Sequence, residues 1–209
     1  MPSLTAEALF AEYLLPLYPA DARDLEAARK TDANPAKNPA ILGHLADASR
    51  VFVGMHAAVL GRDLDLDFSD ASVHRLGAAL GRDARDRLAR SGAPGTPDNA
   101  LFNVIVHGAA YVGECVVRAH GGEWLVRRPL WESRVRLASR AGEAELAVLS
   151  WWLRALADEA FDDAGAVREG LAERYRAYVE VPTTDPAALA PIGPPRSLPR
   201  LKKPRYDVF

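Results

Sequence analysis

The segment that most constrains the fold runs from about residue 97 to residue 120 and is apolar on nearly every side of a helix. It contains no proline after its first turn, and it ends before two glycines, Gly121 and Gly122. A helix without a broad polar side is usually buried at the centre of a domain. We therefore expect the rest of the chain to pack around it. Its main apolar residues are Leu101, Phe102, Val104, Ile105, Val106, Val112, Cys115, Val116 and Val117.

Further helices are predicted on both sides of this central one. Apolar residues recur at helical spacing in five other segments, and capping residues mark several of their ends. The clearest of these segments has Pro39 in the first helical position after Asn38, and Gly61 follows its end. We expect helices at about residues 3–16, 39–60, 70–90, 143–160 and 164–179.

A small sheet is predicted directly after the central helix. In the segment 133–140, arginines alternate with valine and leucine, which is the pattern of a strand with one buried face. Pro129 separates this segment from a second apolar stretch at 123–128. The sequence therefore predicts a mainly α fold of the α+β class, with a small two-stranded antiparallel sheet at about residues 123–140.

The last part of the chain differs in composition from the rest. Residues 182–209 hold seven of the 15 prolines and carry a net charge of +3, which leaves −5 for residues 1–181. We expect one helical domain over 1–181, followed by a proline-rich basic tail. Tyr206 and Phe209 at the end of this tail fit an extended docking peptide, which binds either its own domain or a partner.

Composition argues against several classes of protein. A net charge of −2 gives no support for binding nucleic acid or a membrane surface. No apolar run reaches the roughly 18 residues of a membrane span. The single cysteine, Cys115, excludes an internal disulfide and a zinc site built on cysteines. The first residues lack a secretory signal pattern, so we expect a cytoplasmic protein.

The chain contains no familiar motif for catalysis or for a cofactor. It lacks a glycine-rich phosphate loop, a nucleophile elbow and a zinc-protease motif. Its five histidines do not have metal-ligand spacing. The acidic run at 63–67 resembles the start of a calcium loop, but Phe68 stands where that loop requires glycine. We therefore expect no catalytic residues, no metal and no cofactor.

One polar stripe interrupts the central helix. His107, Tyr111, Glu114 and Arg118 are spaced by four, three and four residues, so they share a helical face. The first interpretation is a structural network, with Glu114 paired to an arginine of a neighbouring helix. A contact with a ligand or partner is a second interpretation. A proton-transfer site is a third.

Four tryptophans lie within a short part of the sequence, at positions 124, 131, 151 and 152. Such clustering is typical of core packing. In the adjacent pair Trp151 and Trp152, however, one side chain is expected to point away from the other. An outward tryptophan would serve as an anchor for a protein partner. The candidate partner-binding residues are therefore Trp151, Trp152, Tyr206 and Phe209.

Two stretches together carry a resemblance to known sequences. The first is the acidic segment that leads from Leu64 into a capped helix, and the second is Tyr111-Val-Gly-Glu followed by Gly121-Gly-Glu-Trp. The combination resembles uncharacterised bacterial protein families with a Tyr-x-Gly-Glu helix and then Gly-Gly-x-Trp at the start of a strand. The resemblance covers about residues 62–137 and implies no catalytic residues. Physically, the pattern predicts a packing device, in which Gly113 admits another backbone and Trp124 covers the helix end.

The sequence favours a non-enzymatic interaction protein of a bacterial cell, such as an immunity, adaptor or regulatory protein. The alternative is an enzyme or a small-ligand-binding protein that uses the stripe from His107 to Arg118. Nucleic-acid binding through the arginine-rich faces and the tail carries little weight because residues 1–181 are acidic. Self-association is left open.

Overall fold

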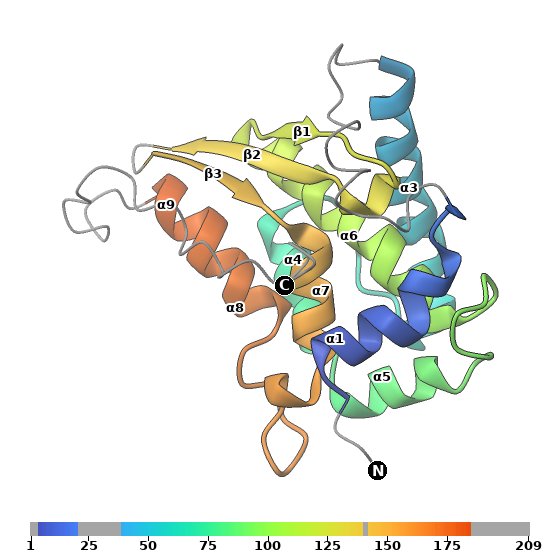
Figure 1. The fold of residues 1–209 in the computed structure, drawn as a ribbon. Coiled ribbons are helices and arrows are strands. Elements are labelled where there is room, and N and C mark those ends of the chain that lie inside the picture. The colour runs from blue at the N-terminus through green and yellow to red at the C-terminus, as the bar shows by residue number, and fades with distance from the viewer. Residues whose placement is uncertain (1–3, 21–38, 140–141, 185–209) are drawn as a thin grey trace.

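The computed structural model describes residues 4–20, 39–139 and 142–184, and they form a mainly helical fold with a small antiparallel sheet (Figure 1). This confirms the predicted fold class. The helices are α1 (Ala6–Leu9), α3 (Pro39–Leu60), α4 (Asp70–Ala79), α5 (Arg82–Ala89), α6 (Ala100–His120), α7 (Val148–Leu156), α8 (Leu171–Tyr175) and α9 (Val181–Thr184). The short 3-10 and π-helical turns are η1 (Phe10–Leu14), η2 (Leu15–Leu17), η4 (Leu130–Glu132), η5 (Asp158–Ala160) and η6 (Arg176–Glu180).

Helix α6 is the central element, as the sequence predicts. The side chain of Asn99 caps it by accepting hydrogen bonds from the backbone N–H groups of Leu101 and Phe102. Gly121 ends it in the left-handed conformation, at φ 67°. Helices α3 and α7 pack against it. The length and composition of α6 also suit a membrane span, but most of the helix is buried inside the fold, as is usual for a core helix.

The sheet has three strands rather than the predicted two. Strands β1 (Glu123–Leu125), β2 (Arg134–Ser139) and β3 (Gly142–Leu146) follow one another in antiparallel order. The segment of β3 was predicted as the start of a helix, and that prediction was wrong. Pairing with β2 holds this segment extended, so that Leu146 lies opposite Val135 and both are buried. Tertiary pairing thus outweighs local preference.

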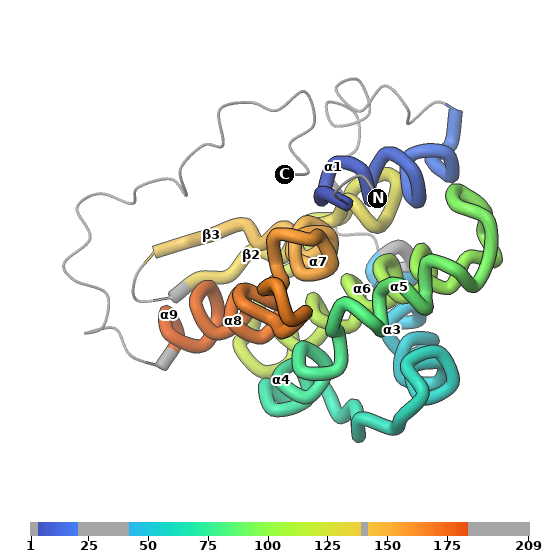
Figure 2. The backbone as a smooth tube through the Cα atoms, turned by 90° about the horizontal axis from the view of Figure 1, so that it is seen from below, coloured from blue at the N-terminus to red at the C-terminus, as the bar shows by residue number. Residues whose placement is uncertain are grey.

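Three predicted helix boundaries also need correction. The helix expected at 70–90 is two helices, because the chain breaks between α4 and α5, where Leu80 leaves helical geometry and Gly81 begins the next helix. The helix expected at 143–160 is α7, which starts only after β3. The helix expected from 164 begins at Leu171, after Gly165 at φ 81°. Figure 2 shows β3 and α8 on one side of the molecule and α3 on the other.

Two glycines on α6 receive tryptophan rings. A Cβ atom on Gly113 would lie 2.0 Å from the indole of Trp124, and one on Gly108 would lie 2.3 Å from the indole of Trp152. The sequence predicts a close backbone neighbour at Gly113. The neighbour is instead an aromatic side chain. These two contacts fix β1 and α7 against the central helix.

Replacing Gly113 by alanine is expected to destabilise the protein by about 1–2 kcal/mol, although alanine normally favours a helix. The added methyl group would force the Trp124 ring out of its place. Gly54→Ala is the matched control, because the corresponding position on α3 has nothing within 4 Å. It should stabilise the protein by about 1 kcal/mol. Denaturant unfolding of both variants measures the difference, and equal effects would contradict this packing.

Candidate functional site

Within the polar stripe on α6, Glu114 and Tyr111 are buried. His107 is half-buried and Arg118 is exposed. Glu114 is only 7% exposed, and its two carboxylate oxygens are both engaged. Trp124 Nε1 donates to Oε1 at 2.9 Å, and Arg118 Nε donates to Oε2 at 3.0 Å. The arginine partner is therefore on the same helix, four residues on, and does not come from a neighbouring helix as predicted. This carboxylate has its charge compensated inside the protein.

Tyr111 is fully buried, and its hydroxyl is also occupied. The hydroxyl accepts from the backbone N–H of Phe68 at 3.0 Å and lies 2.5 Å from Ser72 Oγ. Burial raises the pKa of Tyr111 well above its ordinary value, so the phenol stays protonated. The ring of Phe68 packs on Tyr111, and the guanidinium of Arg118 lies 3.6 Å above the Phe68 ring centre. The acidic segment before α4 therefore closes over the stripe.

His107 is the fourth residue of the stripe, and it forms no hydrogen bond with the other three among the described residues. Its Nδ1 lies 2.9 Å from the carbonyl oxygen of Asn103, one turn back on the same helix. Within the described part of the chain, only Glu114 and Arg118 of the four stripe residues bond to each other. An acid and a base are thus not brought together around a shared space, which general acid–base chemistry requires.

The adjacent tryptophans both point into the protein. Trp151 is 7% exposed and stacks on Tyr178, whereas Trp152 is fully buried against Phe52. The prediction that one of them points outward as an anchor was wrong. Helix α7 packs between the central helix and the C-terminal helices, and this packing buries both of its tryptophan side chains. The other two candidates, Tyr206 and Phe209, lie outside the described residues.

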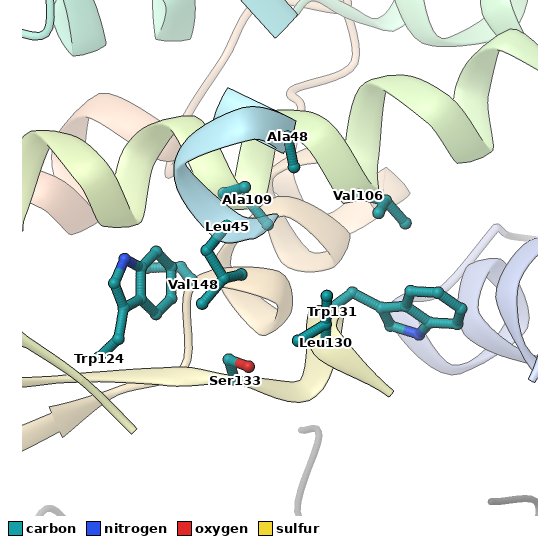
Figure 3. Close-up of a pocket in the computed structure, with 10 residues that line it drawn as sticks. Leu45, Ala48, Val106, Ala109, Trp124, Leu130, Trp131, Ser133 and Val148 are labelled. Carbon is teal, nitrogen blue, oxygen red and sulfur yellow. The ribbon is translucent and has the colours of Figure 1, made fainter. Parts of the chain in front are cut away.

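An apolar cavity of about 190 Å³ lies on another side of α6 and is open at its mouth (Figure 3). Trp124 lies at one end of the cavity and Trp131 at the other. Ser133 is a polar wall residue, and its hydroxyl oxygen already accepts the backbone N–H of Arg127 at 3.0 Å. None of the described residues that line this space has an ionisable side chain. The lining residues are Leu45, Ala48, Val106, Ala109, Ala110, Trp124, Leu130, Trp131, Ser133 and Val148.

The ring of Trp131 packs against two other aromatic rings at this cavity. It packs edge-on against Tyr18 at 5.2 Å and Phe102 at 5.9 Å between ring centroids. Its indole Nε1 is buried and has no hydrogen-bond partner among the described residues. The cavity can therefore hold an apolar or aromatic group between fixed walls, and its chemistry is that of binding.

Cys115, the free thiol of the central helix, is buried beside this polar network. Burial raises the pKa of the Cys115 thiol to about 12. In the unfolded chain a thiol titrates near pH ~8.5, so between these values the unfolded state binds fewer protons. Stability is therefore expected to fall by about 1–2 kcal/mol as pH rises from about 8.5 to about 10.5. Urea unfolding across this range should show a shallower decline for Cys115→Ala, and an identical decline would contradict the burial of the thiol.

Among the described residues, no group of three or more histidine, cysteine, aspartate or glutamate side chains is arranged to hold a metal ion. Comparison with known proteins finds no matching family model, no similar curated protein and no similar solved structure.

Proposed function

We propose that this protein is a non-enzymatic interaction protein of the bacterial cytoplasm, and that its apolar cavity receives an anchor side chain from a protein partner. The observation that carries the proposal is an open cavity with apolar walls, to which α3, α6 and η4 contribute. Aromatic anchors seated in such pockets contribute much of the binding energy at protein interfaces.

The size of the cavity favours a single side chain over a complete small ligand. Pockets for small ligands usually enclose roughly 300–1,000 Å³, whereas this cavity encloses about 190 Å³. A dry cavity of roughly 150 Å³ is known to hold one benzene ring. One aromatic or large aliphatic side chain therefore matches the space available.

The geometry of the polar stripe also favours binding at the apolar cavity over a ligand or catalytic site at the stripe. The alternative function, an enzyme or ligand-binding protein that uses the stripe, needs Glu114 to face an open pocket. In the fold, Trp124 and Arg118 engage both of its oxygens. We therefore assign the stripe a structural role and place binding at the apolar cavity.

Affinity capture from the native cell tests this function with two matched variants on α3. Ala48→Phe fills the cavity from its wall, whereas Ala58→Phe adds the same ring at an exposed position of the same helix. The wild type and Ala58→Phe should retain the same stoichiometric partner, and Ala48→Phe should lose it while remaining folded. Capture of no stoichiometric partner, or equal capture by all three proteins, would contradict the proposal.

A further inference from the structure

A second cavity, separate from the apolar one, lies where α1, α7, η5 and α8 meet. In Figure 1, α7 lies between α1 and α8. The cavity encloses about 290 Å³, and three of its lining residues are alanines, which leave space rather than fill it. Five charged side chains complete the lining. These are Glu7, Arg154, Glu159, Glu169 and Arg174.

Two guanidinium groups of this cavity have unused hydrogen-bond donors. Arg174 is largely buried, with 12% of its side chain exposed, and it pairs with Glu169 at 3.3 Å. Its Nε, however, is buried and has no hydrogen-bond partner among the described residues. Arg154, from the last turn of α7, makes no hydrogen bond or ion pair within the described part of the chain. A buried donor without a partner, such as Nε of Arg174, is rare and costly, and an acceptor from a ligand would satisfy it. The half-buried Arg154 offers further donors beside it.

The positive charges of the two arginines also favour an anionic ligand in this cavity. Burial is the main cause that lowers the pKa of Arg174, the carboxylate of Glu169 raises this pKa, and the nearby charge of Arg154 lowers it by a smaller amount. Glu169 pairs with Arg174 on one side, and a ligand anion between the two guanidinium groups would stabilise both of them. A carboxylate matches guanidinium groups in charge and geometry.

Glutamates at the rim restrict the kind of anion. Glu7 and Glu159 are exposed, and the side chain of Glu169 is 66% exposed. They would repel a compact polyanion such as phosphate and would attract a cationic group carried by the same ligand. Arginines inside and glutamates outside therefore suit a molecule with a carboxylate at one end and an ammonium group at the other.

We propose that this cavity binds a small zwitterion of the α-amino-acid class, with its carboxylate between Arg154 and Arg174 and its ammonium group toward the glutamate rim. The cavity volume of about 290 Å³ suits a molecule of this size. The two cavities share no lining residue, although α7 contributes Val148 to one and Arg154 to the other. The second site does not depend on a partner protein at the first.

Calorimetric titration of the full chain tests the proposal with each of the twenty common L-amino acids as probe. Acetate, ethylamine and inorganic phosphate serve as single-charge and polyanion controls. At least one amino acid should bind saturably and raise the melting temperature, and none of the three controls should match it. Binding by no amino acid, or equal binding by phosphate or acetate, would overturn the proposal.

Variants of two arginines assign the binding to this cavity. Arg154→Gln should weaken amino-acid binding about tenfold to a hundredfold, because a charge-assisted hydrogen bond is lost. It should leave the fold intact, because Arg154 has no hydrogen-bond or ion-pair partner to lose among the described residues. Arg176→Gln is the control, since this arginine is 60% exposed and lies outside the cavity lining. Equal affinities in the two variants would overturn the assignment.

Discussion

Replacing Trp152 by alanine is expected to lower the free energy of unfolding by about 3–5 kcal/mol. The side chain is fully buried, lies in the space that Gly108 leaves on α6, and meets the Phe52 ring at 5.8 Å between centroids. Its loss would empty a large volume between α3, α6 and α7. Because domains are typically stable by roughly 5–15 kcal/mol, this variant should be partly unfolded near physiological temperature.

The control for Trp152→Ala is Tyr178→Ala on η6. Tyr178 is 38% exposed and covers the buried ring of Trp151 from outside, so its removal leaves no internal cavity. Urea unfolding should show a loss less than roughly half of that for Trp152→Ala. Similar losses in both variants would show that Trp152 is not a centre of the core.

Replacing Trp124 by phenylalanine is expected to cost about 3 kcal/mol, which combines lost ring volume with a lost hydrogen bond to a charged group. Trp124 Nε1 donates to the buried carboxylate of Glu114, and its ring fills the space beside Gly113. Phenylalanine would leave Oε1 of Glu114 buried without this donor. The variant therefore measures how strongly the polar stripe is built into the fold.

Trp131→Phe is the matched control for this hydrogen bond. It removes the same atoms from another cavity-lining tryptophan, but the Nε1 of Trp131 has no partner among the described residues. The two variants should differ by about 1.5–3 kcal/mol, which is the contribution expected from a hydrogen bond to a charged group. Equal losses in the two variants would contradict a stabilising hydrogen bond from Trp124 to Glu114 and would leave this carboxylate free to act on a ligand.

Local sequence signals predicted the parts of the fold that depend on local physics. The apolar pattern of α6 and the positive φ of Gly121 follow from the sequence itself. Strand β3 was missed because the charges at 143 and 145 also suit a helix. Pairing with β2 holds this segment extended, so that residues 143 and 145 become alternate residues of a strand.

The stripe and the cavity depend on tertiary contacts, which local sequence patterns do not predict. Spacing placed Glu114 and Tyr111 on one face of α6, but the groups that cover them, Phe68 and Trp124, come from other elements. The cavity was missed altogether. Small residues such as Ala109 look like ordinary packing positions in a sequence, and they border a cavity only because α3, β1 and η4 surround them without filling the space.

The most direct test of the proposed binding site is a toluene titration followed by NMR of the four tryptophan indole N–H signals. A benzene-sized ring should enter the cavity and shift the signals of Trp124 and Trp131, which line it. The Trp151 signal should stay in place, Ala48→Phe should abolish the shifts, and Ala58→Phe should preserve them. Unmoved signals of Trp124 and Trp131, or shifts that persist in Ala48→Phe, would contradict an open cavity that accepts an apolar anchor.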